Sequence, residues 1–143
     1  PGLDWMAAAE EEGEGVHGSY DWIVGYDDLA PFLMPDFLRA SHEARILDVG
    51  CGTSELSERM HRAGYTDILS VDIDARQIEA MRERHAGKPG LRWDTVDMTD
   101  AKSLRDGAFD VVVDKGTFDA LLCNDLASHV ALSISLSLSL SHT

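Results

Sequence analysis

Short apolar runs alternate with helical patterns through the central part of the chain. Four runs have the length of buried strands and cover residues 45–49, 68–71, 91–96 and 109–113. Between them, large or apolar residues recur at helical spacing, namely Leu56, Met60 and Ala63, then Ile78, Met81 and His85. Strands that alternate with helices over short connections predict an α/β fold with a parallel, right-handed, doubly wound sheet.

Capping signals predict where these two helices begin and end. Ser54 is expected to cap the first helix, and Gly64 is expected to end it in the left-handed conformation. Asp74 is expected to cap the second helix, and Gln77, three residues later, would complete a capping box. The turn after the first strand is therefore predicted to lead almost directly into a helix.

The segments on either side of this array differ from it in composition. Residues 1–19 contain an acidic, glycine-bearing run and are predicted to form a flexible lead-in. Residues 20–38 are rich in aromatic and apolar side chains, and we expect short helices, broken at two prolines, that pack on the domain. The chain thus divides into an acidic N-terminal segment (1–19), a domain over 20–123 and a Ser/Leu-rich tail over 124–143.

The composition is that of a globular chain with a strongly acidic surface. Apolar residues make up 44%, charged residues 27%, and the formal net charge is −14. This charge repels nucleic-acid backbones and anionic membranes, so a basic protein is the expected partner. The alternative is that the acidic surface only keeps the protein in solution. No stretch approaches the roughly 20 apolar residues of a membrane span, and the acidic start is unlike a signal peptide. Two cysteines and six histidines show no disulfide framework or metal-ligand spacing, so we expect a reducing, cytoplasmic location and no metal site.

The glycine-rich turn after the first strand is the most informative motif. Residues 46–54 read Ile-Leu-Asp-Val-Gly-Cys-Gly-Thr-Ser, and Asp72 follows twenty residues after Gly52. Glycines let the backbone approach a ligand, and the start of the next helix offers unpaired N–H donors. Asp72, at the end of the second strand, is placed to accept hydrogen bonds from ribose hydroxyls. The pattern predicts a nucleoside-cofactor site.

Two further acids, Asp97 and Asp114, follow the third and fourth predicted strands. Singly, each is more commonly an exposed residue at a strand end than a ligand. The carboxyl ends of parallel strands meet at one edge of a sheet, so these acids and the glycine turn are expected to converge on one crevice. There, Asp97 could accept from the exocyclic amine of adenine.

The glycine pattern selects among nucleoside cofactors. A dinucleotide fingerprint needs a third glycine where this chain has Glu55, whose carboxylate would repel a pyrophosphate. No Gly-Lys-Ser/Thr sequence follows at the spacing of a phosphate-binding loop. Adenosine without phosphates fits better, and Asp48 could attract the ammonium group of an attached amino acid. S-adenosylmethionine has this chemistry, and a nicotinamide-dependent oxidoreductase is kept as an alternative.

The same residues resemble those of class I S-adenosylmethionine-dependent methyltransferases, which have a Rossmann-like sheet. The loop at 46–54 and the Val-Asp-Ile-Asp segment at 71–74 carry this resemblance. Three strings are similar to the translation elongation factor 1-alpha lysine methyltransferases: Tyr-Asp-Trp at 20–22, Leu-Arg-Trp at 91–93 and Asp-Lys-Gly-Thr-Phe-Asp-Ala at 114–120. The resemblance implies methylation of a protein lysine, with a basic translation factor as a candidate substrate.

The resemblance also implies roles for individual residues. Those around the methionine part of the cofactor would be Asp48, Gly50, Gly52 and Ser54. Those at the ribose and the adenine would be Asp72 with Ile73 and Asp97 with the Met98 backbone. Those beside the reactive methyl group, with a catalytic role, would be Asp114 and Lys115.

The family's sheet has seven strands, whereas this chain supplies four before the Ser/Leu alternation begins. We therefore expect a partial, C-terminally truncated domain whose fourth strand forms an exposed apolar edge. Three functions compete on this basis. They are an active S-adenosylmethionine-dependent protein lysine methyltransferase, a cofactor-binding fragment without turnover, and an NAD-dependent oxidoreductase.

Overall fold

The computed structural model describes residues 25–122 of the 143-residue chain. The expected flexible lead-in, the Tyr-Asp-Trp string and the Ser/Leu-rich tail lie outside these residues. The helical elements are α2 (Tyr26–Leu29), η1 (Ala30–Leu33), α3 (Pro35–Leu38), α4 (Leu56–Arg62), α5 (Ala75–Arg84), η2 (Met98–Asp100) and α6 (Thr117–Leu122). The strands are β1 (Arg45–Val49), β2 (Asp67–Asp72), β3 (Leu91–Thr95) and β4 (Val111–Asp114).

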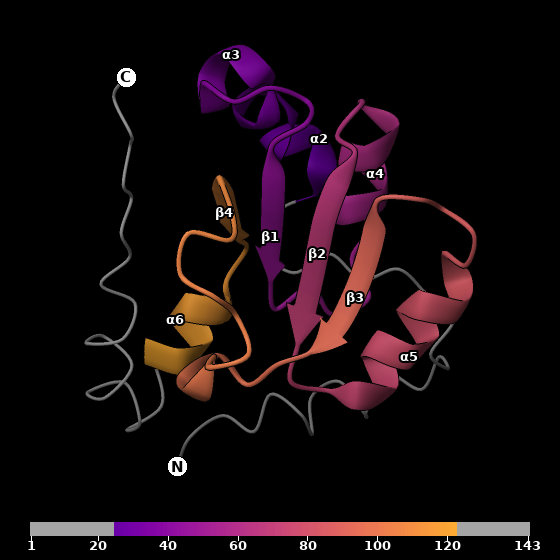
Figure 1. The fold of residues 1–143 in the computed structure, drawn as a ribbon, viewed down its shortest axis with the longest axis vertical. Coiled ribbons are helices and arrows are strands. Elements are labelled where there is room, and N and C mark those ends of the chain that lie inside the picture. The colour runs from indigo at the N-terminus through magenta and orange to yellow at the C-terminus, as the bar shows by residue number, and fades with distance from the viewer. Residues whose placement is uncertain (1–24, 123–143) are drawn as a thin grey trace.

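The four strands form one parallel sheet in the order β3-β2-β1-β4. Their carboxyl ends lie at the same edge, where the arrowheads in Figure 1 point. The register pairs Val49 with Val71 on one side and with Asp114 on the other, and Asp72 with Thr95. The predicted parallel α/β sheet is confirmed, and the end of β1 lies between the ends of β2 and β4.

One face of the sheet is covered by α4 and α5. Their buried side chains, among them Met60 and Ile78, pack with Ile46 and Ile68 of the central strands in one apolar cluster. Side chains alternate between the faces of a strand, so Leu47 and Val71 belong to a second, smaller cluster on the opposite face. That face is covered by side chains between Met98 and Phe109.

The short helices α2, η1 and α3 precede the sheet. Pro31 and Pro35 stand in the first turns of η1 and α3, as expected from the fixed φ of proline and its missing N–H. The Tyr65 hydroxyl donates to the Leu33 carbonyl, and this contact ties η1 to the loop that follows α4. The predicted packing of this leading segment on the domain is confirmed for Tyr26, Leu29, Leu33 and Leu38. It is wrong for Phe32, which is 53% exposed.

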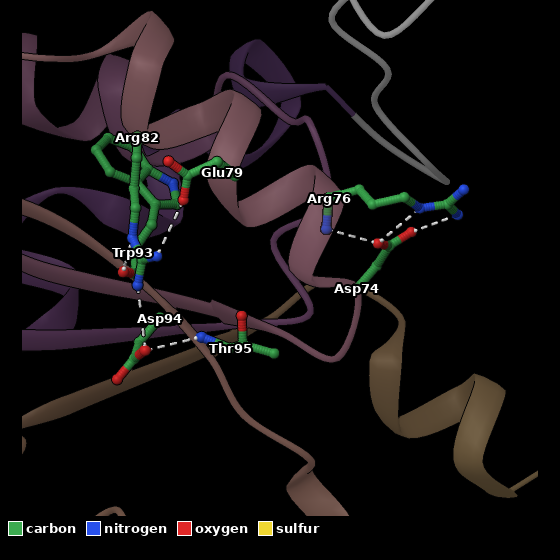
Figure 2. Close-up of polar contacts among 7 residues, drawn as sticks. All are labelled: Asp74, Arg76, Glu79, Arg82, Trp93, Asp94 and Thr95. Atoms are coloured by element: carbon green, nitrogen blue, oxygen red, sulfur yellow. Dashed lines mark hydrogen bonds and ion pairs between the residues drawn. The ribbon is translucent and has the colours of Figure 1, made fainter.

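Side chains bind two backbone groups at the outer edge of β3, as Figure 2 shows. Arg82 Nε donates to the Trp93 carbonyl at 3.0 Å, and its two terminal nitrogens reach Glu79 and Asp94 at 3.2 and 3.3 Å. The Thr95 N–H donates to the Asp94 carboxylate at 2.9 Å. Side chains thus occupy backbone groups that a further strand would need. At the other edge, β4 is the last strand within residues 25–122, and Val112 is 41% exposed.

Several helix and strand boundaries in the structure differ from those predicted from the sequence. Strand β4 begins at Val111 and not at Phe109, because the Asp110 carboxylate binds the Arg45 guanidinium and backbone N–H at the start of β1. Strand β3 ends at Thr95, and Asp97 caps η2 two residues later. Ser54 accepts from the Leu56 N–H, but α4 itself begins only at Leu56.

Within the described residues, no helix is long and apolar enough to cross a membrane. The same residues contain no group of three or more His, Cys, Asp or Glu side chains placed to hold a metal ion. Cys51 is buried and unpaired with another cysteine, and Cys123 lies outside the described range.

Candidate functional site

The glycine turn connects the end of β1 to α4. Gly50 and Gly52 both have positive φ angles, +64° and +51°, which side-chain-bearing residues rarely adopt. The Cys51 N–H donates to the Val71 carbonyl at 3.0 Å and so fastens the turn to the end of β2. The sequence-based expectation that these glycines shape a tight turn at the carboxyl edge is confirmed.

Asp72 holds the turn from the neighbouring strand. One carboxylate oxygen accepts from the Gly52 N–H and the other from the Asp74 N–H, both at 2.9 Å. A carboxylate oxygen can accept more than one hydrogen bond, so the fixed Asp72 keeps capacity for hydroxyl donors. Beside it, Ile73 is 52% exposed although its side chain is large and apolar. A fixed acceptor next to an exposed apolar surface suits a sugar carrying a flat base.

Asp74 continues this segment into α5 and caps it. Its carboxylate accepts from the Arg76 N–H at 2.9 Å and pairs with the Arg76 guanidinium (Figure 2). These contacts with Arg76 hold the pKa of Asp74 below its usual value. The predicted cap is confirmed, but the Asp74 N–H donates to Asp72 and not to Gln77, so the second bond of the predicted capping box is not formed.

Asp48 lies in β1, two residues before the turn, with 2% of its surface exposed. Ser57 of α4 donates to its carboxylate at 2.8 Å, and the Ser57 hydroxyl also lies 2.5 Å from that of Ser70, which pairs with Asp48 across the strands. Burial raises the pKa of Asp48 to about 6, while the Ser57 hydrogen bond and the nearby charge of Lys115 lower it and Asp114 raises it. A positive charge beside this carboxylate favours its ionised form, as the effect of Lys115 shows.

Asp97 and Met98 lie beyond the end of β3. The Asp97 carboxylate is exposed and accepts from the Thr99 N–H and hydroxyl at 2.8 and 2.7 Å. The Thr99 hydrogen bonds lower the pKa of Asp97, so it is a charged acceptor. Both bonds use the same carboxylate oxygen. Met98 is partly buried against the second apolar cluster, which fixes the backbone that follows Asp97.

Asp114 ends β4 and caps α6. Its carboxylate accepts from the N–H groups of Gly116, Thr117 and Phe118 at 2.9, 2.8 and 2.9 Å. The structure therefore shows a structural use for this acid, and its expected catalytic use stays a prediction. Lys115, the next residue, is partly buried and close enough to Asp48 to lower the pKa of that acid.

The topology brings the expected site residues to one edge of the sheet. Along the order β3-β2-β1-β4, this edge carries Asp97, Asp72, the glycine turn and Asp114 in succession. The sequence analysis missed three residues that hold this arrangement, namely Ser57, Ser70 and Thr117. Ser70 could have been found as the polar residue inside an otherwise apolar run, and Thr117 lies within the string at 114–120.

The family described as "Methyltransferase domain" matches residues 46–134, which is more than half of the chain. The chain belongs to this methyltransferase family. The match begins at β1 and includes the glycine turn, Asp72, Asp97 and Asp114.

Individual proteins similar to this chain are also named as methyltransferases. EEF1A lysine methyltransferase 4 from Bos taurus is 38% identical over 114 residues, covering 80% of this chain and 43% of that protein. The eEF1A lysine and N-terminal methyltransferase from Mus musculus is 42% identical over 108 residues, covering 75% of this chain and 15% of that protein. The crystal structure of a TehB-like SAM-dependent methyltransferase from Corynebacterium glutamicum has a TM-score of 0.54 at 25% identity, covering 90% of this chain and 59% of that one.

The methyltransferase family implies S-adenosyl-L-methionine as the cofactor, and the residues present fit it. Asp72 is a fixed acceptor at the strand end, Ile73 offers an exposed apolar surface, and Asp48 supplies a carboxylate two residues before Gly50. The dinucleotide alternative is less favoured, because the family match is to methyltransferases and Glu55 occupies the third-glycine position. The chain spans about two fifths of the length of the first of these relatives.

Proposed function

We propose that this chain binds S-adenosylmethionine at the carboxyl edge of its sheet and serves the methylation of a lysine in a basic protein. The observation that carries the proposal is the Asp72 carboxylate, held by the Gly52 and Asp74 N–H groups at 2.9 Å each. Because both oxygens are already oriented, little ordering is required when ribose hydroxyls bind.

Each part of the cofactor has residues to receive it in this proposal. The ribose and adenine would contact Asp72, Ile73, Asp97 and the Met98 backbone. The methionine part would lie along Gly50, Gly52 and Ser54, with its ammonium group near Asp48. The reactive methyl group would then face the end of β4, at Asp114 and Lys115.

The main task of the chain in this reaction would be to align the methyl donor with the acceptor amine. Bound S-adenosylmethionine supplies an activated methyl group on a sulfonium, so no covalent intermediate with the protein is required. Alignment of this kind is worth up to about 7–11 kcal/mol in favourable cases. The acceptor lysine has an unperturbed pKa near 10.4 and must lose a proton before it reacts. Asp114 is the proposed positioning group for this amine. Its carboxylate can accept a further hydrogen bond besides those from the three backbone N–H groups.

The substrate proposal rests on charge and on relatives. A chain with a net charge of −14 attracts a basic protein and repels nucleic acid. Two relatives are named as an EEF1A lysine methyltransferase and as an eEF1A lysine and N-terminal methyltransferase. A lysine of a basic translation factor, in the reducing interior of a cell, is therefore the proposed acceptor.

A second candidate is cofactor binding without turnover. It is favoured by the Asp114 carboxylate, which three N–H groups of the α6 start already engage. In this case the chain would bind S-adenosylmethionine but leave an acceptor amine without its positioning group.

Methyl transfer separates these two candidates. The purified chain would be incubated with methyl-labelled S-adenosylmethionine and a lysine-rich protein such as a translation elongation factor 1-alpha. The methyltransferase proposal predicts label on lysine that disappears when Asp72→Ala removes the ribose acceptor. The matched control is Asp67→Ala, which changes an acid at the opposite end of β2. Cofactor binding with no label on any lysine would support the second candidate and contradict the first.

A further inference from the structure

Thr117, the first residue of α6, bridges the two sides of the candidate site. Its hydroxyl donates to the Val49 carbonyl, with the oxygens 3.1 Å apart, and its backbone N–H donates to Asp114 at 2.8 Å. Val49 is the last residue of β1 and stands in register with Asp114. Thr117 therefore connects these strand ends just beyond their last paired residues.

The Thr117 side chain also occupies the space above Gly50. A Cβ atom added to Gly50 would lie 1.6 Å from the Thr117 hydroxyl oxygen and 2.8 Å from its Cβ. The first glycine of the turn is therefore required by an internal contact, besides its positive φ. This contact joins residues 67 positions apart, so sequence spacing alone did not reveal it.

The hydrogen bond to Val49 has a consequence for the whole turn. A peptide unit is planar, so holding the Val49 carbonyl also fixes the direction of the Gly50 N–H in the same plane. Gly50 then leads through Cys51 to Gly52, whose N–H reaches Asp72. One hydroxyl of α6 thus orients the backbone at the start of the glycine turn.

We propose that Thr117 is a positioning residue. It holds the backbone of the glycine turn through the Val49 carbonyl and links this turn to Asp114 and Lys115 at the end of β4. This inference rests on the proposed function, because its effect is read as cofactor affinity. In this role, the hydroxyl matters more than the volume of the side chain. Thr117 need not touch the cofactor.

The test compares three side chains at position 117 in the full chain. Thr117→Val keeps the shape and removes the donor, so affinity for S-adenosylmethionine is expected to fall measurably, by up to about tenfold, the limit set by one neutral hydrogen bond. Thr117→Ser keeps the donor and loses one methyl group, so its affinity should stay within about twofold of the parent chain. The readouts are calorimetric titration and the melting temperature without ligand. A residue that only supports folding would change the melting temperature and leave the affinity of the folded protein unchanged.

Equal affinity of the valine variant and the parent chain would overturn the inference, and so would a serine variant as weak as the valine one. If the valine variant does not fold, Thr117→Ala, which introduces no added bulk, carries the same expected loss relative to serine. If the parent chain itself does not bind S-adenosylmethionine, the proposed function fails. Binding by the parent with no serine–valine difference refutes only the role of Thr117.

Discussion

Replacing Asp48 with asparagine is expected to stabilise the ligand-free chain at neutral pH while weakening cofactor binding. Asp48 is 2% exposed, and burial raises its pKa from 3.8 to about 6. A rise of this size corresponds to a cost of about 3 kcal/mol for ionising the carboxyl group in the folded state. Asparagine has nearly the same shape and no charge, so it removes that cost.

The direction of the pKa shift sets the pH dependence. A carboxyl whose pKa is raised by folding destabilises the folded state when it is ionised. The penalty is therefore absent below about pH 4 and complete above about pH 6. The advantage of Asp48→Asn in the free energy of unfolding should grow across this window to at most about 3 kcal/mol. The new amide N–H group reduces the gain, because it must find an acceptor at Ser57 or Ser70.

Urea unfolding at about pH 4.5 and about pH 7.5 measures this difference, with Asp67→Asn as the control at a half-exposed acid that pairs with Arg92. Titration with S-adenosylmethionine at the higher pH should show affinity reduced by about tenfold or more, because the substitution removes the proposed charged partner of the ammonium group. The reasoning is refuted if Asp48→Asn is less stable than the parent at neutral pH, or if its stability difference does not change with pH.

Three further variants test the fold and the turn. Met60 of α4 is fully buried in the main apolar cluster, so Met60→Ala should lower the free energy of unfolding by about 2–5 kcal/mol in urea, and a loss under about 1 kcal/mol would contradict the described core. The Arg45 guanidinium lowers the pKa of Asp110 to about 2, so this pair's contribution is present above about pH 4 and is lost as pH falls toward 2. Asp110→Asn should therefore remove part of the acid sensitivity of thermal unfolding, and an unchanged acid profile would count against the pair. Gly50→Ala places a Cβ against Thr117 at a positive φ, so both the melting temperature and the cofactor affinity should fall, and parent-like values would show that this contact is wrong.

The sequence pattern predicted those parts of the fold that depend on residues close together in the chain. Strand β1 was predicted with its observed bounds, since an apolar run ending in glycine is a short-range signal. The Asp74 cap was also predicted, since it needs only the backbone two residues away. The start of β4 was wrong because Asp110 is held by Arg45, 65 residues earlier in the chain.

The same distinction between neighbouring and distant residues applies to the candidate site. The sequence placed Asp72 correctly at the end of β2, since strand-end acids are visible in the pattern. It did not reveal that Ser57 and Ser70 surround Asp48, because this depends on strand register and on the rotation of α4. Nor did it reveal Thr117 above Gly50, a contact created only when α6 returns to the end of β1.

Calorimetric titration of the full chain with S-adenosylmethionine tests the central claim most directly. The account predicts binding at one site per chain, loss of that binding in Asp72→Ala, and unchanged binding in Asp67→Ala. NAD in the same experiment should give no binding. A folded parent chain that does not bind S-adenosylmethionine, or an Asp72→Ala variant that binds it as tightly as the parent, would contradict the account.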